Sequence, residues 1–406
     1  MKSAISLFSG AGGMDYGFEA AGFETKVAVE FDHDCCETLR KNRDFAVIER
    51  DIMKVPTAEM LEAGGLKQGD VSLLFGGPPC QPFSKAGYWA RGDSKRLEDP
   101  RANTLWAYMR VVEEALPQAF VLENVSGLAF SGKDEGLQLL LERIKEINKK
   151  TKSNYQPSFK VLNAAGYGVP QIRERFFIVA SREGERFNFP TPSFEDPSND
   201  STLVGLEPYR TAWDAIGDLP EPADEDLAMR GKWAKLLPSI PEGQNYLWHT
   251  DRGGGLPLFG WRRRYWSFLL KLAKNRPSWT IQAQPGPAIG PFHWKSRRLS
   301  ARELCRIQTF PDDVEIVGSR TSVQKQIGNA VPSLLAEVVG RALAAQVFSA
   351  RRSSAPKLLP LRRQPVPAAE RVGTVRSEFR LLSGVHVAHP GTGRGNRSQQ
   401  GVLAST

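Results

Sequence analysis

One stretch of the chain decides how the rest folds, Leu74-Phe75-Gly76-Gly77-Pro78-Pro79-Cys80-Gln81-Pro82-Phe83-Ser84. The apolar run that leads into it, Val71–Phe75, is short and bounded by turn residues, which is typical of a buried parallel strand. The two glycines allow another group to approach the backbone closely, and the two prolines exclude a helix. Cys80 is therefore predicted just past the carboxyl end of a strand, where open α/β sheets gather ligands and reacting groups. A buried thiol is the commoner role of cysteine, but core packing does not require these neighbours, so Cys80 is a candidate nucleophile.

A glycine-rich turn lies near the start of the chain, between a predicted strand at Ile5–Phe8 and a helical pattern that runs to Ala21. Such a turn lets a ligand sit against backbone N–H groups at the start of the helix. The turn lacks the Gly-Lys-Ser/Thr ending of a P-loop. On its own it suits a nucleotide, a phosphate or a plain tight turn.

Two further predicted strands end in polar residues that suit adenosine. Lys26–Val29 is followed by Glu30 and Phe31, an acid that suits a ribose diol and a ring that can stack on adenine. A third strand, Ala46–Ile48, is followed by Asp51-Ile52, which offers another polar contact. Together with the glycine-rich turn, these residues predict an adenosine-containing cofactor.

Charged residues also follow the next strands. The buried run Ala119–Leu122 ends in Glu123, which places a carboxylate at the same sheet edge as Cys80. A glutamate after a strand is usually solvated, but a gathering of polar strand ends favours catalysis. Arg173 and Arg175 alternate by two, so both point to one face if the segment, which leads into a predicted hairpin, is extended. The polar residues 85–101 are predicted to form a mobile loop that closes over a substrate.

The composition of the 406 residues indicates two domains and a tail. Periodicity fades after Arg182 while proline, glycine and acid increase, so the predicted catalytic domain comprises residues 1–185 and 320–350, and a smaller domain comprises 186–319. A capping box at Ser300 and Glu303 predicts a helix from Ala301 to Thr309, and a last helix is predicted for 333–348. Residues 351–406 contain ten Arg or Lys and two Glu with little periodicity, and are predicted to form a disordered basic tail.

The smaller domain has the features of a nucleic-acid surface. Residues 230–298 contain thirteen Arg or Lys and two acids, which predicts a phosphate-binding surface. Most of the nine tryptophans lie after residue 210. Several alternate with bases, as in Trp261-Arg262-Arg263-Arg264-Tyr265-Trp266, an arrangement that suits phosphates and bases together. Most of these tryptophans are nevertheless expected in the core of the domain.

The four cysteines and five histidines have no paired metal-ligand spacing, so no metal is expected. No apolar run approaches the roughly 20 residues that span a membrane, and the first predicted strand leaves no room for a signal peptide. These patterns predict a protein of a reducing cytoplasm.

Taken in order, the motifs resemble those of the cytosine-C5 DNA methyltransferases, across residues 1–185 and 295–348. The resemblance implies an α/β, Rossmann-like, doubly wound sheet with a target-recognition domain, and S-adenosylmethionine as the methyl donor, with S-adenosylhomocysteine as its product. The residues implied to bind this cofactor are Phe8, Ser9, Gly10, Gly12, Gly13, Glu30, Phe31, Asp51, Ile52, Pro78, Asn329 and Val331.

The resemblance also implies the catalytic roles. The Cys80 thiolate attacks C6 of a flipped-out cytosine, Glu123 contacts N3 and Arg175 contacts O2, while Asn124 and Arg173 position their neighbours. The residues expected to contact DNA are Gln81, Ser84, Arg262, Arg263 and Arg264.

The expected protein is a monomeric modification enzyme of a restriction-modification system, acting on double-stranded DNA at the bacterial nucleoid. A cognate endonuclease would act separately, and no membrane partner is expected. Three alternatives remain. An RNA (tRNA) cytosine-C5 methyltransferase of the same fold keeps these motifs. A catalytically silent DNA-binding relative would not need Cys80, Glu123 and Arg175. A Rossmann dehydrogenase has no role for Pro-Pro-Cys-Gln.

Overall fold

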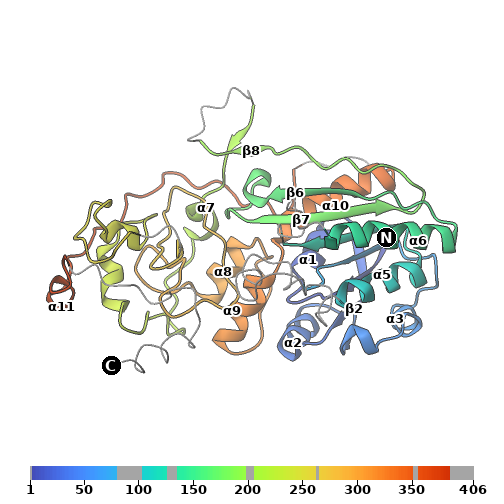
Figure 1. The fold of residues 1–406 in the computed structure, drawn as a ribbon, viewed down its shortest axis with the longest axis horizontal. Helices are drawn as coiled ribbons and strands as arrows, with labels where there is room; N and C mark the ends of the chain where they lie inside the picture. The colour runs from blue at the N-terminus through green and yellow to red at the C-terminus, as the bar shows by residue number, and fades with distance from the viewer. Residues whose placement is uncertain are drawn as a thin grey trace, which may run out of the picture.

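The computed structural model describes residues 2–79, 103–125, 135–197, 205–261, 265–350 and 355–384. These residues form two lobes (Figure 1). We call them the sheet lobe (residues 2–181 and 333–347) and the second lobe (residues 210–329).

The sheet lobe is built on a seven-stranded sheet in the order β3-β2-β1-β4-β5-β7-β6. Its strands are β1 (Lys2–Leu7), β2 (Phe23–Glu30), β3 (Ala46–Glu49), β4 (Leu73–Gly76), β5 (Ala119–Asn124), β6 (Ser158–Asn163) and β7 (Glu174–Ser181). The first five are parallel, whereas β7 runs antiparallel to both β5 and β6. The predicted doubly wound sheet and its terminal hairpin are confirmed, and the strand order reverses direction between β1 and β4.

Helices cover both faces of this sheet, which is why its central strands are continuous apolar runs. The helices of the sheet lobe are α1 (Gly13–Ala20), α2 (His33–Asn42), α3 (Thr57–Ala63), α5 (Asn103–Ala115), α6 (Glu135–Thr151) and α10 (Ser333–Val347), with short 3-10 turns η1 (Ile52–Lys54) and η5 (Ala164–Tyr167). Helices α1 and α10 share one hydrophobic cluster, and α3, α5 and α6 share another on the opposite face. By length and composition the stretch Arg320–Val347 contains an 18-residue segment that is apolar enough to cross a membrane. In the structure, 61% of that segment is buried inside the protein.

The second lobe contains short elements and long irregular segments. They are α7 (Ala212–Ile216), η6 (Ala234–Ser239), η7 (Tyr246–His249), α8 (Ala301–Ile307) and α9 (Arg320–Asn329), with a two-residue pair β8 (Phe194–Glu195) and β9 (Glu207–Pro208) beside it. The capping box at Ser300 is present, since its hydroxyl accepts the Glu303 N–H at 3.1 Å and the Glu303 carboxylate accepts the Ser300 N–H at 2.8 Å. The expectation that most tryptophans lie in the core is wrong for three of them, Trp261, Trp266 and Trp279, which are 41%, 47% and 38% exposed.

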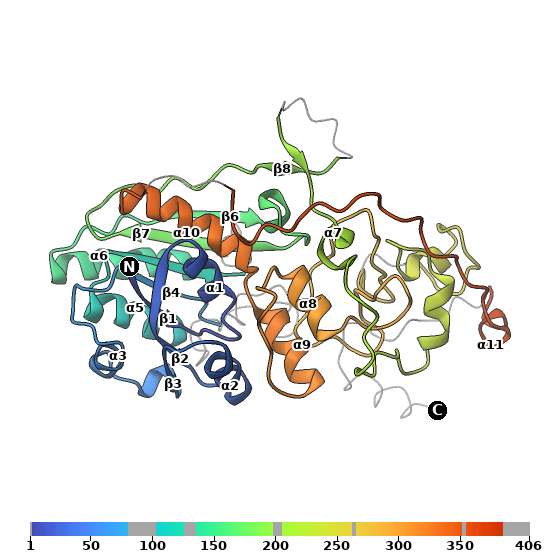
Figure 2. The ribbon, with the colours of Figure 1, turned by 180° about the vertical axis from the view of Figure 1, so that it is seen from behind.

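The prediction of a disordered tail is wrong for residues 355–384, which we call the strap. The strap runs from α10 across α7 to the short helix α11 (Ser377–Arg380) at the far end of the second lobe (Figure 2). Individual contacts at scattered residues hold the strap in place. Its apolar residues have no regular spacing, so the composition alone predicted disorder. Residues 385–406 lie outside the described residues.

Candidate active site

The carboxyl ends of β4 and β5 form the centre of the site, with Gly76 paired to Leu122. A side chain at Gly76 would lie 2.5 Å from the Leu7 carbonyl oxygen, and one at Gly77 would lie 2.8 Å from the Glu123 carboxylate. The predicted close approach at these glycines is therefore confirmed. The backbone turns past Glu123 toward Cys80, and Cys80, Gln81, Ser84 and the loop 85–101 lie outside the described residues.

Glu123 and Arg175 form a buried ion pair, with Nε of Arg175 2.8 Å from Oε1 of Glu123. The pair forms because β5 and β7 are neighbours and place Glu123 opposite Phe177. Arg175 lies two residues from Phe177 on β7, so both side chains point to the same face of the sheet. Burial raises the pKa of the Glu123 carboxyl, and the charges of Arg175 and Arg173 oppose that rise. Burial lowers the pKa of Arg175, with Glu123 opposing it. The site thus holds a carboxyl that binds a proton more readily than usual beside a fixed cation.

Asn124 holds the backbone that leads to Cys80. Its side-chain amide donates to the Pro78 carbonyl oxygen at 3.1 Å, and its own side-chain oxygen accepts the Val125 N–H at 2.8 Å. Thr104 adds a second contact by donating to the Pro79 carbonyl at 3.2 Å. The structure therefore places Asn124 and Pro78 together, as neighbours that position one another.

Arg173 lies only two residues from Arg175 but serves the framework. It is 1% exposed, and its guanidinium donates to the carbonyl oxygens of Gly328 at 2.6 Å, Ala330 at 3.0 Å and Ile281 at 3.1 Å. It joins the sheet lobe to the end of α9 and to Ile281, both in the second lobe. Arg173 therefore helps to hold the segment that carries Arg175 and its ion pair with Glu123.

Two glutamines that the sequence did not single out complete this framework. Gln171 is fully buried, donates to Gln308 Oε1 at 3.0 Å and accepts the Ile281 N–H at 3.0 Å. Gln308 in turn donates to the Ile327 carbonyl at 2.7 Å. The signal in the sequence is a polar residue within an apolar pattern, which is too common to identify a partner more than one hundred residues away.

The predicted cofactor loop follows β1 at the point where the sheet order reverses. Phe8, Gly10 and Gly12 all have positive φ, at 55°, 53° and 82°, so the chain turns sharply and then enters α1. A side chain at Gly10 would meet no atom within 4 Å, whereas one at Gly13 would lie 2.5 Å from the Val331 carbonyl oxygen. There is open space in front of Gly10, and Gly13 lets α1 approach the segment before α10. Ser9 is buried and its hydroxyl lies 2.7 Å from that of Ser6.

Glu30 shapes this loop. Its carboxylate accepts the N–H groups of Gly10 at 2.8 Å, Phe31 at 2.8 Å and Asp32 at 2.9 Å. A carboxylate has about four acceptor positions, so one remains for a ribose hydroxyl. Phe31 beside it is 68% exposed, an unusual position for a large apolar ring. The open space, the free acceptor and the exposed ring fit an adenosine group.

The remaining predicted cofactor residues are more dispersed. Asp51 caps η1 by accepting the Met53 N–H at 3.0 Å, and Ile52 is 4% exposed in the core. Asn329 is exposed at the end of α9, and Val331 is buried where α10 begins. Their contacts with a cofactor stay predictions.

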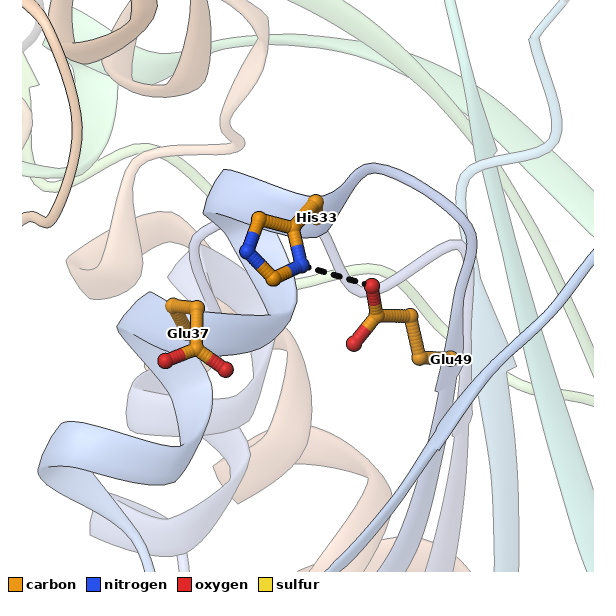
Figure 3. Close-up of side chains that lie close together, drawn as sticks. All are labelled: His33, Glu37 and Glu49. Carbon is orange, nitrogen blue, oxygen red and sulfur yellow. Dashed lines mark hydrogen bonds and ion pairs between the residues drawn. The ribbon is translucent and has the colours of Figure 1, made fainter.

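Three possible metal ligands lie close together, His33 and Glu37 on α2 and Glu49 on β3 (Figure 3). Nδ1 of His33 lies 2.7 Å from Glu49, but Arg40 pairs with Glu37 at 2.8 Å and with Glu49 at 2.6 Å. Both carboxylates are already paired with one guanidinium. We interpret the group as a surface ion-pair network.

The sheet, the loop at its reversal point and the Glu123–Arg175 pair together define a methyltransferase with a Rossmann-like catalytic lobe. Residues 2–345 match the sequence model of the family described as C-5 cytosine-specific DNA methylase, and the chain belongs to that family. S-adenosylmethionine is the methyl donor of this family.

Several relatives are similar over most of the chain. Type II methyltransferase M.SacI of Streptomyces achromogenes is 43% identical over 368 residues, which cover 84% of this chain and 93% of the relative. Type II methyltransferase M.NgoFVII of Neisseria gonorrhoeae is 37% identical over 331 residues, covering 81% and 82%. Among solved structures, a protein encoded within an E. coli prophage has a TM-score of 0.60 at 23% identity, covering 86% of this chain and all of that one. A Spodoptera frugiperda DNMT2 mutant has a TM-score of 0.58 at 16% identity, with the same coverage. These two structures share the fold.

Proposed function

We propose that this protein transfers a methyl group to C5 of a cytosine within a specific sequence of duplex DNA, as the modification enzyme of a restriction-modification system. The observation that carries the proposal is the buried Glu123–Arg175 pair at 2.8 Å, beside the backbone that leads to Cys80. A carboxyl and a guanidinium fixed side by side match the N3 and O2 edge of a cytosine.

The chemistry requires electrons to be added to the ring, because C5 of cytosine is a poor nucleophile. The Cys80 thiolate forms a bond to C6, and the charge that develops on the ring is met by Glu123 at N3 and Arg175 at O2. The raised pKa of Glu123 favours a protonated carboxyl that donates to N3. The bound cofactor supplies the methyl group. Methyl transfer leaves S-adenosylhomocysteine. C5 then loses its proton to solvent water and the C6–sulfur bond breaks, which restores the thiolate and the aromatic ring. Since C6 and C5 are not accessible within the base stack, the cytosine is flipped out.

The cofactor would be held by the loop after β1, with Phe31 stacked on adenine and the free position of Glu30 on the ribose. Asp51, Ile52, Pro78, Asn329 and Val331 would complete the site. No step of this chemistry needs a metal.

We further propose that residues 186–319 recognise the DNA sequence. The exposed Trp266 and Trp279 lie 5.6 Å apart in an edge-to-face pair, in a segment rich in Arg and Lys. Aromatic rings with nearby cations suit contacts with bases, sugars and phosphates. Arg262, Arg263 and Arg264, which lie outside the described residues, would contribute phosphate contacts. The protein would act as a monomer in the bacterial cytoplasm at the nucleoid, and any cognate endonuclease would act separately.

The test is bisulfite sequencing of duplex DNA after incubation with S-adenosylmethionine and either the intact protein or Cys80→Ser. We expect protected cytosines at one recurring short sequence with the intact protein and none with the variant. Protection by both proteins would contradict the role of Cys80. Protection by neither would contradict DNA as the substrate, and the same assay on tRNA would then test the RNA alternative.

A further inference from the structure

The first residues of the strap (residues 355–384) donate hydrogen bonds to a buried acid of the sheet lobe. Glu337 on α10 is 0% exposed. Its carboxylate accepts the main-chain N–H groups of Lys357 at 2.7 Å and Leu358 at 2.9 Å. Leu358 and Leu359 then pack against the hydrophobic cluster that α1 and α10 share. This end of the strap is part of the sheet lobe.

The middle of the strap donates hydrogen bonds to a buried polar residue of the second lobe. Asp214 on α7 is 1% exposed, and its carboxylate accepts the Arg363 N–H at 2.7 Å. The Arg363 guanidinium also donates to the Asp214 carbonyl and pairs with Asp218 at 2.7 Å. The contact therefore uses both the backbone and the side chain of one strap residue.

Lys274 shows most clearly that the second lobe depends on the strap. Its side chain is 4% exposed, and its ammonium group has three donors. They reach Glu242 at 2.8 Å, the Ala368 carbonyl at 3.0 Å and Glu370 at 2.9 Å. Two of these three acceptors belong to the strap. Without them the buried ammonium group would keep Glu242 alone and lose two of its three acceptors, which is unfavourable.

The far end of the strap covers the aromatic cluster of the second lobe. Phe379 is 4% exposed and stacks on Trp233, with ring centroids 5.9 Å apart and planes 22° apart. Two backbone contacts flank it, from the Gly373 N–H to the Pro238 carbonyl at 2.8 Å and from the Gly384 N–H to the Pro257 carbonyl at 3.2 Å. The strap is thus attached along the whole second lobe.

We propose that the strap is a positioning element that holds the second lobe in the orientation in which it presents DNA to the sheet lobe. The inference rests on the proposed role of the second lobe in DNA recognition. Near the site the lobes already meet, where Ser278 exchanges backbone hydrogen bonds with Pro170 and Ile172. A second attachment along the far side prevents rotation about the first. Orientation set before binding reduces the entropy lost when DNA binds. The family match ends at residue 345, before the strap begins.

The test compares two double variants of the full chain. Glu370→Gln with Phe379→Ala removes one ionic and one aromatic anchor, while the control, Leu361→Ala with Leu381→Ala, changes two strap side chains that are 76% and 82% exposed. We expect the anchor variant to raise the KM and Kd for duplex DNA by about tenfold. We expect kcat to stay within about twofold and the Kd for S-adenosylmethionine to be unchanged in both variants.

An unchanged KM for DNA in the anchor variant would overturn the proposal. A parallel loss of kcat, DNA binding and cofactor binding would also overturn it, because that pattern indicates unfolding. If the intact protein methylates no duplex DNA, the proposed function fails instead, and hydrogen exchange at Ser278 and Ile281 then decides the question alone. Faster exchange only in the anchor variant supports the holding role of the strap, and equal exchange in both variants contradicts it.

Discussion

The two lobes are held together by different means. In the sheet lobe, seven strands are joined by continuous backbone ladders, and helices bury both faces. In the described part of the second lobe, backbone pairing is limited to isolated bridges such as Phe268 with Ile289, and the core is a cluster of rings that includes Trp233 and Phe259. A sheet fixes strand ends relative to one another and so fixes catalytic groups. A lobe without a sheet depends on individual side chains for its shape and orientation, and single substitutions should therefore affect the two lobes differently.

Substitution of Arg173 is expected to have the largest effect, because this residue makes contacts with both lobes. Arg173→Ala removes a donor from three carbonyl groups, of which only that of Ala330 keeps another, from Gln308 at 3.3 Å, and we expect a loss of about 5 kcal/mol in the free energy of unfolding. Arg173→Lys keeps a charge but not the planar fork and should recover less than half of that loss. Chemical denaturation measures both. A loss under about 1 kcal/mol for the alanine variant would contradict the bridging role.

Asp15 tests the sheet lobe alone. This buried acid accepts hydrogen bonds from Ser6 at 3.1 Å and Thr25 at 3.2 Å, and burial, followed by the charge of Glu19, raises its pKa from 3.8 to about 7. The folded state therefore binds the proton more tightly than the unfolded state, so its contribution to stability is present at low pH and is lost as pH rises from about 4 to about 7. We expect Asp15→Asn to gain stability relative to the intact protein over that range, by up to about 4 kcal/mol, and to show no further gain above it. Thermal unfolding at a series of pH values measures this, with the exposed Asp70→Asn as a control; parallel curves would refute the prediction.

Glu123 tests whether the rigid strand ends carry the chemistry. Glu123→Gln keeps the size of the side chain but removes the carboxyl group, which pairs with Arg175 when ionised and donates to N3 when protonated. We expect kcat for methyl transfer to fall about 100-fold with unchanged cofactor affinity. Glu174→Gln, which changes an exposed neighbour of Arg175, should have little effect. Equal loss in both variants would mean that the pair has no special role.

Phe31 tests the cofactor loop with the smallest expected effect. Removing a ring that stacks on adenine should raise the KM for S-adenosylmethionine about tenfold and leave the KM for DNA unchanged. Phe159→Ala is the matched control, because Phe159 is 47% exposed on the edge strand β6. The assignment fails if the two variants bind the cofactor equally well.

The sequence by itself determined the sheet lobe and the composition of its site. Apolar runs placed the strands, Gly76 and Gly77 indicated the close approach, and Glu123 was expected at the sheet edge where it is found. The resemblance implied that Arg175 contacts the same base, and the two side chains form an ion pair. These features are readable because strand burial, turn chemistry and capping depend on neighbouring residues.

Only the tertiary structure showed which groups Arg173 binds, since they are carbonyl groups more than one hundred residues away in the chain. It also showed that Glu30 already accepts three backbone N–H groups, and that a segment of disordered composition is an ordered strap. The physical reason is the same in each case. A local pattern specifies that a residue is polar or apolar, but its partner is set by contacts between distant segments, and those exist only once the chain has folded.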